Sequence, residues 1–155
     1  MRIARRHGGY TLCADRQAVD LHRFRHLVTQ ARAPEEDTRT AALLEQALAL
    51  WRGQALTGAD TPWAEAVREA LHHERLAAES DVTDVRLRPG HHTELLGGLR
   101  TRARQHPWDE RPAGQLMLTL HRCGRSAEAL EHYERARHPA RRPAGVGASS
   151  CVKRM

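Results

Sequence analysis

The sequence has few of the features that mark a secreted, membrane-bound or disulfide-bonded protein. Its 155 residues include only three cysteines, Cys13, Cys123 and Cys151, and no two of them have CxxC spacing. No run of 18 apolar residues occurs, and the arginine-rich first 20 residues lack the apolar segment of a secretory signal. We therefore expect reduced thiols, no membrane span and a cytoplasmic location.

Patterns that carry catalysis or metal binding are also missing. The sequence has no GxSxG, P-loop or GxGxxG motif. Among its 11 histidines, His22 and His26 have the spacing of a two-histidine ligand pair on one helix face, but no third ligand follows at short spacing. His72-His73-Glu74 lacks the second histidine of an HExxH site. These absences predict that the chain is not an enzyme and has no metal and no cofactor.

The positive charge of the chain is concentrated at its ends. The formal net charge is +6, but residues 20–137 carry an excess of one negative charge. Residues 1–19 have an excess of three positive charges and residues 138–155 an excess of four. Since a nucleic-acid surface ordinarily has its basic stripe on the fold itself, we interpret these ends as solvated basic segments.

One sequence pattern occurs twice, 34 residues apart. Gly90 and Gly124 are each followed at the fourth position by a glutamate, Glu94 or Glu128, and then by apolar residues at helical spacing. Glycine can take the positive φ that ends one helix before the next begins, so each copy predicts an antiparallel helix pair. A period of 34 residues resembles the tetratricopeptide repeat, a stack of such pairs.

Apolar spacing and capping residues predict the remaining elements. A glycine turn followed by alternating residues at 8–14 predicts a short strand or half a hairpin. Helices are expected at residues 21–32, from about residue 35 to Gly53, from Pro62 to about Pro89, and at 92–105, followed by the pair around Gly124. We predict an all-α fold of about six helices in stacked antiparallel hairpins, with a short β segment at the N-terminus.

Several residues mark the expected ends of these helices and the faces that they bury. Asp20 is the expected N-cap of the first helix, and Val19 and Phe24 have the spacing of a hydrophobic staple. The first helix is expected to bury Leu21, Phe24, Leu27 and Val28, and the long third helix could break near Ser80-Asp81. Thr61 and Asp109 are expected caps. Trp51, Trp63 and Trp108 lie beside helix boundaries, where aromatic rings usually pack helices together.

Three stretches of sequence carry a resemblance to a known family. They are Ala47-Leu48-Ala49-Leu50-Trp51-Arg52-Gly53-Gln54-Ala55-Leu56, then His106-Pro107-Trp108-Asp109-Glu110-Arg111-Pro112, and then the segment from Leu116 to Leu130. In this order they resemble the bacterial transcriptional activator domain of SARP-type antibiotic-pathway regulators of actinobacteria, over about residues 19–137. The resemblance implies an all-helical, tetratricopeptide-like module that follows a winged-helix DNA-binding domain.

The resemblance also implies a domain organisation. Residues 1–18, with Gly8-Gly9-Tyr10-Thr11-Leu12, look like the remnant of a winged-helix C-terminal hairpin, without the helix that would enter the major groove. Residues 19–138 correspond to the activator domain. Residues 139–155 are rich in proline and glycine and contain no acid, so we expect a disordered basic tail.

The function expected from these features is protein interaction in transcription control. The partner would be a second copy of the chain or the transcription machinery, and we expect an interaction face near Arg100, Gln115, Arg122 and Glu131. An alternative is weak, non-specific nucleic-acid binding in which Arg2, Arg5 and Arg6 contact phosphates. A second alternative is a truncated relic without a role of its own.

Overall fold

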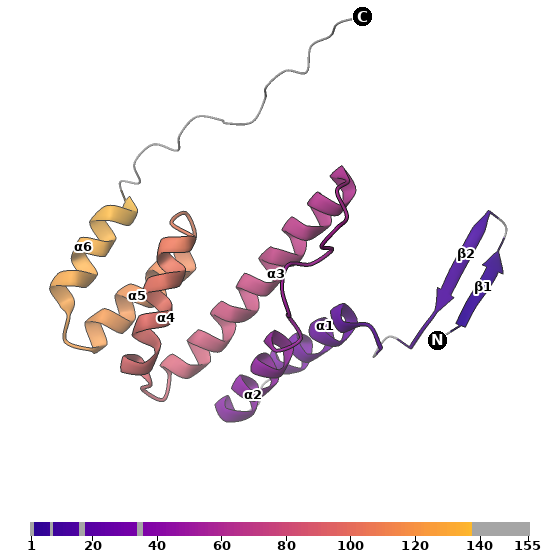
Figure 1. The fold of residues 1–155 in the computed structure, drawn as a ribbon. Helices are drawn as coiled ribbons and strands as arrows, with labels where there is room; N and C mark the ends of the chain where they lie inside the picture. Colours follow the sequence, from indigo (N-terminus) through magenta and orange to yellow (C-terminus); the bar gives the residue numbers. More distant parts are fainter. Residues whose placement is uncertain (1, 7, 16–17, 34–35, 138–155) are drawn as a thin grey trace, which may run out of the picture. The chain divides into compact units, whose positions relative to one another are not determined.

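The computed structural model describes residues 2–6, 8–15, 18–33 and 36–137. These contain two strands and six helices (Figure 1): β1 Arg2–Arg6, β2 Gly9–Cys13, α1 Asp20–Ala31, α2 Asp37–Leu48, α3 Pro62–Leu87, α4 His92–Gln105, α5 Glu110–Arg122 and α6 Ser126–Arg137. The chain divides into two compact units, one up to His91 and one from His92. The predicted helical class with a short N-terminal β segment is confirmed, whereas the predicted disordered tail lies outside the described residues.

The N-terminal β segment is a complete hairpin. β1 and β2 pair antiparallel, with Arg2 opposite Cys13 and Arg6 opposite Gly9. Gly8 in the turn has φ +90°, a conformation that favours glycine. The residue pattern predicted β2 alone, because β1 has the sequence Arg-Ile-Ala-Arg-Arg and lacks a regular apolar alternation, whereas the family resemblance implied a hairpin within residues 1–18.

The first helical unit packs α1 against α2 and α2 against α3 around one apolar cluster. Its buried residues come from all three helices: Phe24, Val28, Ala31, Leu44, Ala47, Ala78 and Val82. Ala47 and Ala78 have no exposed surface, and such small side chains allow helices to approach closely. The ring of Trp51 meets Phe24 edge-on with centroids 5.4 Å apart, so this tryptophan packs inward as predicted.

The start of α1 differs from the prediction. Val19, not Asp20, is the N-cap residue, and no side chain caps the helix. Asp20 lies in the first turn, where its carboxylate accepts a hydrogen bond from Arg52 at 2.8 Å. Because the helix begins one residue early, Val19 and Phe24 lose the staple spacing, and Val19 is exposed. Leu21 and Leu27, expected to be buried, are only half-buried.

α2 is shorter than the sequence predicted, and α3 is a continuous helix. α2 ends at Leu48, well before Gly53. Thr61 caps α3 as predicted, since its hydroxyl accepts a hydrogen bond from the Ala64 N–H at 3.2 Å. The helix then runs without the break considered near residues 80–81. Ala78, Val82 and Val85 form a buried stripe through this region, and burial of that stripe favours a continuous helix.

The second helical unit packs α4 against α5 and α5 against α6. Its buried cluster is smaller and contains Leu99, Ala103, Leu116, Leu120 and Ala129. Asp109 caps α5 as predicted, because its carboxylate accepts from the Arg111 N–H at 3.1 Å. Gly124 has φ +76° and lies in the turn where α5 ends and α6 has not yet begun, as the repeated pattern predicted.

Candidate functional site

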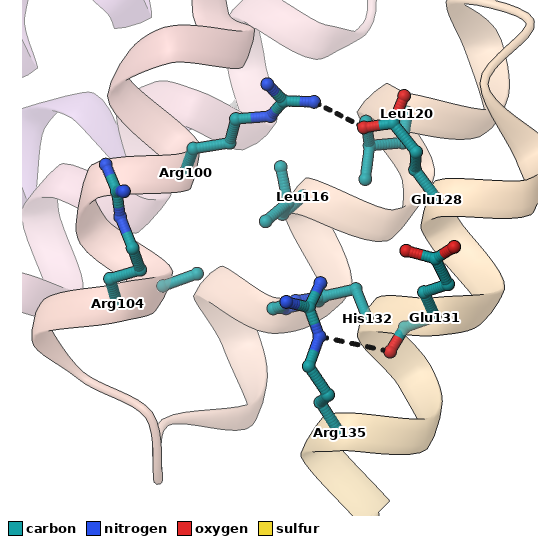
Figure 2. Close-up of a pocket in the computed structure, with 9 residues that line it drawn as sticks. Arg100, Arg104, Leu116, Leu120, Glu128, Glu131, His132 and Arg135 are labelled. Carbon is teal, nitrogen blue, oxygen red and sulfur yellow. Dashed lines mark hydrogen bonds and ion pairs between the residues drawn. The ribbon is translucent and has the colours of Figure 1, made fainter.

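The candidate site is an open groove of about 260 Å³ in the second helical unit. In Figure 2, α4 forms one side, α6 forms the other, and Leu116 and Leu120 of α5 lie between them. The floor is apolar and the rims are charged, and the groove is lined by Arg100, Ala103, Arg104, Leu116, Leu120, Glu128, Glu131, His132 and Arg135. This combination is typical of surfaces that bind other proteins.

Helical spacing brings the rim residues together. Arg100 and Arg104 are four residues apart on α4, so both face the same side of that helix. On α6, Glu128 is followed at three and four residues by Glu131 and His132, and then by Arg135. Both rims therefore follow from the 3.6-residue period once the packing of the two helices on α5 turns them toward each other.

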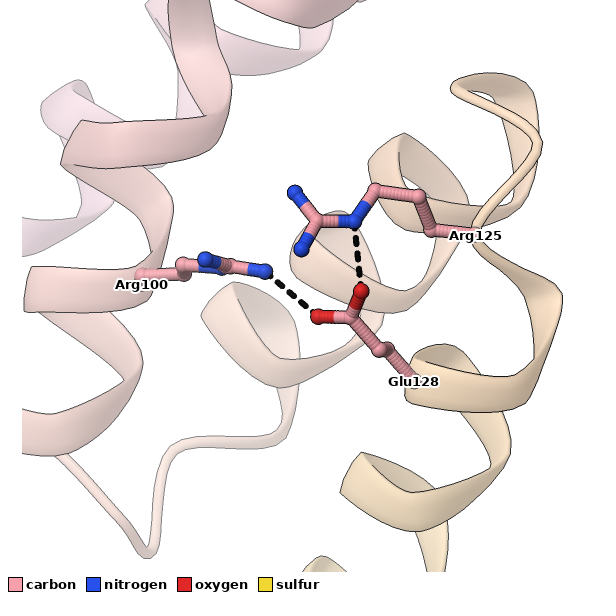
Figure 3. A network of polar contacts seen from close by, with 3 residues as sticks. All are labelled: Arg100, Arg125 and Glu128. Carbon is pink, nitrogen blue, oxygen red and sulfur yellow. Dashed lines mark hydrogen bonds and ion pairs between the residues drawn. The ribbon is translucent and has the colours of Figure 1, made fainter.

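Glu128 joins the two rims (Figure 3). One oxygen of its carboxylate accepts a hydrogen bond from Arg100 at 2.6 Å, and the other accepts from Arg125 at 2.5 Å. About 40% of each of these side chains is exposed, so water screens the interactions and each contributes modestly to stability. The arrangement uses both oxygens of Glu128 and leaves one guanidinium charge uncompensated.

His132 and Arg135 lie beside each other on α6 (Figure 2). Burial lowers the pKa of His132, and the positive charge of Arg135 lowers that pKa further, so both effects favour the neutral imidazole. Its Nε2 atom is buried and, within the described part of the chain, has no hydrogen-bond partner. The Nε of Arg135 donates to the backbone carbonyl of Glu131 at 3.2 Å. When Nε2 carries the imidazole proton, an acceptor oxygen of a ligand would satisfy this buried nitrogen.

The structure brings together two of the four predicted interaction residues. Arg100 and Glu131 line the groove, whereas Arg122 is exposed outside it. Gln115 is only 5% exposed, because α5 turns this face into the helix pack, so its expected place on an interaction face is wrong. Arg104 and Arg135 also line the groove and were not predicted, although each lies four residues from a predicted residue, Arg104 from Arg100 and Arg135 from Glu131.

The residues considered for nucleic-acid and metal binding are scattered. Arg2 and Arg5 are exposed on β1, and phosphate contact by these arginines, with Arg6, stays a prediction. His22 and His26 are exposed on α1. Among the residues that the structure describes, no three histidine, cysteine, aspartate or glutamate side chains gather as metal ligands, and no helix is long and apolar enough to cross a membrane.

The tryptophans differ from one another in burial. Trp63 is 69% exposed and Trp108 is 53% exposed, so the prediction that they pack helices together is wrong for both. Trp51 lines a second, mainly apolar hollow of about 550 Å³ in the first helical unit, together with Phe24, Leu56 and Leu71. Arg75 lies over the Trp51 ring at 5.5 Å. This hollow has fewer charged groups than the groove and belongs to the other unit.

Comparison with known proteins identifies the family. Residues 19–155 match the bacterial transcriptional activator domain. The chain belongs to this family. The transcriptional regulator RedD of Streptomyces coelicolor is 37% identical over 150 residues, which cover 95% of this chain and 43% of RedD. The regulatory protein DnrI of Streptomyces peucetius is 33% identical over 153 residues, which cover 96% of this chain and 56% of DnrI.

A solved structure has the same fold. The structure of Mycobacterium tuberculosis EmbR in complex with low affinity phosphopeptide superposes with a TM-score of 0.81 at 25% sequence identity. The match covers 86% of this chain and 36% of the EmbR chain. It confirms the predicted fold class, and the family match confirms the predicted resemblance. This member of the family spans about half, or less, of the length of RedD and DnrI.

Proposed function

We propose that this chain serves in transcription regulation as a helical interaction module in the cytoplasm. The match of residues 19–155 to the bacterial transcriptional activator domain carries this proposal. Two relatives that match more than nine tenths of the chain, RedD and DnrI, are a transcriptional regulator and a regulatory protein. The module would raise transcription by binding a protein, either the transcription machinery or a second copy of itself.

The groove between α4 and α6 supports a protein partner. Its floor exposes part of the apolar cluster, and its rims carry charged side chains that can select a partner. Leu130 and Tyr133 of α6 are 66% and 45% exposed, which adds apolar surface to the same helix. We therefore expect α6 to contribute most of the contacts.

A tethering experiment tests this function. The full chain is fused to an unrelated DNA-binding domain in a Streptomyces host, and the matching operator is placed upstream of a weak promoter that drives a reporter. We expect reporter transcription to rise severalfold above that given by the DNA-binding domain alone. A fusion that accumulates to the same level, occupies the operator and leaves transcription unchanged contradicts the proposal.

A matched pair of variants locates the surface in the same assay. Leu130→Asp places a charge on the exposed apolar surface of α6, and Leu118→Asp makes the same change at a leucine of α5 that is 41% exposed. Neither leucine lines the groove, so the pair compares the exposed surface of α6 with that of α5. We expect the first variant to lose more activation than the second. Equal losses would place the partner elsewhere on the chain.

A further inference from the structure

We propose that the groove between α4 and α6 binds an acidic segment of the partner protein, in which carboxylates pair with Arg104 and Arg135 and apolar side chains contact the floor. This proposal rests on the proposed function, because it names the chemical class of the partner at the same surface. It goes beyond that function by assigning a preference for acidic ligands and the side chains that produce it.

The charge of the groove favours an anion. Its rims and the adjoining turn carry four arginines, Arg100, Arg104, Arg125 and Arg135, against two glutamates, Glu128 and Glu131. The excess is therefore two positive charges when Arg125 of the turn is included and one over the lining residues alone, with His132 counted as neutral. The helical body as a whole, residues 20–137, has an excess of one negative charge. The groove is thus a local basic site on a nearly neutral body, and such a site attracts carboxylates selectively.

The distribution of ion pairs shows which arginines are available. Both oxygens of Glu128 are occupied, one by Arg100 and one by Arg125. Arg135 uses its Nε on a backbone carbonyl, so its terminal nitrogens remain for a ligand. Arg104 is exposed, and none of the described residues forms an ion pair or hydrogen bond with its guanidinium. Among the arginines of the groove, Arg104 and Arg135 are therefore the two that form no ion pair with a carboxylate of the described residues.

The positions of the other polar groups agree with an acidic ligand. Figure 2 shows the Glu131 carboxylate on the α6 side of the groove, well apart from Arg104 on the α4 side, so it does not neutralise that arginine. The buried Nε2 of His132 lies on the same wall and lacks a partner among the residues described. If this nitrogen carries the imidazole proton, it donates to a ligand carboxylate or carbonyl oxygen.

Three labelled peptides test the proposal on the purified full chain by fluorescence anisotropy. Each peptide has ten residues: two leucines for the apolar floor, four serines and four variable positions. The variable positions are all glutamate in the first peptide, all glutamine in the second and all lysine in the third. We expect the glutamate peptide to bind at least about tenfold more tightly than the glutamine peptide, equivalent to about 1.4 kcal/mol. The lysine peptide should bind most weakly.

Variants assign the effect to the groove. Arg104→Glu with Arg135→Glu should weaken the glutamate peptide at least tenfold, and Arg104→Gln alone should weaken it severalfold without placing a new charge. Arg23→Glu is the matched control, because Arg23 is exposed on α1 in the other helical unit. It should leave the affinity within twofold. A circular dichroism melt of each variant confirms that it is folded.

The results separate this inference from the proposed function. Equal affinity for the glutamate and glutamine peptides, tighter binding of the lysine peptide, or equal weakening by Arg23→Glu overturns the acidic-segment proposal. A tethered chain that still activates the reporter would then keep the proposed function. Conversely, a charge-selective groove in a chain that does not activate when tethered supports the site and contradicts the transcriptional role.

Discussion

The two helical units differ in the size of their buried clusters and in the placement of their charged side chains. The first has seven buried residues in its cluster, with Trp51 packed edge-on against Phe24. Ion pairs link its helices, among them Arg25 with Glu74 and Arg86 with Glu45. The second has five buried residues, all leucine or alanine, and five of its charged side chains line the groove. The first unit therefore supplies more of the packing energy, and the second supplies the surface for a partner.

The largest expected effect comes from the core. Leu44 in α2 and Leu99 in α4 are each 2% exposed, so replacing either with alanine removes the same buried groups from a different unit. We expect Leu44→Ala to lower the free energy of unfolding by about 2–5 kcal/mol, and Leu99→Ala to cost less because its smaller cluster leaves fewer contacts to lose. Urea denaturation followed by circular dichroism measures both.

An exposed leucine provides the control for this comparison. Leu130 is 66% exposed, so Leu130→Ala should change the free energy of unfolding by less than about 0.5 kcal/mol. If Leu99→Ala costs as much as Leu44→Ala, the two clusters are equally stabilising and the contrast between the units is lost.

Local rules predicted the second unit better than the first. The bounds of α4, the Asp109 cap and the positive φ of Gly124 follow from residues close in sequence, and the structure has them where the sequence placed them. In the first unit the Asp20 cap and the end of α2 were wrong. Both depend on tertiary contacts, such as the bond between Asp20 and Arg52, which joins residues 32 positions apart.

Burial and the groove could be predicted only in part. The exposure of Trp63 and the continuity of α3 depend on which helix face meets a neighbour, and a single helix pattern does not specify this for flanking aromatic residues. The same limit applies to the groove. The periodicity places Arg100 with Arg104, and Glu131 with Arg135, but only the packing of α4 and α6 on α5 brings the two pairs to one surface.

A glycine-to-alanine substitution in α4 is expected to stabilise the second unit and so reduce the difference in stability between the two units. Gly97 and Gly98 lie inside α4, and an added Cβ at either position would meet no atom within 4 Å other than those of its chain neighbours and the backbone of the same helix. Gly97→Ala should therefore stabilise the chain by up to about 1 kcal/mol, since alanine is the better helix former. Urea denaturation measures the gain. Gly124→Ala is the contrasting variant, because φ there is +76°, and we expect it to destabilise. Loss of stability in Gly97→Ala would contradict the regular helix seen through this region.

The smallest expected effect concerns the ion pair between α1 and α3. Arg25 donates two hydrogen bonds to Glu74, at 2.8 and 2.6 Å, and these hydrogen bonds lower the pKa of the Glu74 carboxyl below its ordinary value of 4.5. Because the folded-state pKa is lowered, the stabilisation is present above the unfolded pKa and is lost as the pH falls through the folded pKa. The side chains are 49% and 34% exposed, so we expect Glu74→Gln to cost less than about 1 kcal/mol at pH 7.

The pH dependence distinguishes this pair from a general charge effect. The difference in free energy of unfolding between the unchanged chain and Glu74→Gln should shrink as urea titrations move from pH 7 to acid below the ordinary carboxyl pKa. Glu69→Gln removes an exposed carboxylate from the same helix and is the control for a general charge effect. Glutamine keeps the aliphatic groups of glutamate, so a Glu74→Gln difference that stays constant with pH would mean that the charge of Glu74 does not produce it. That result would contradict a stabilising ion pair between Arg25 and Glu74 in the first unit.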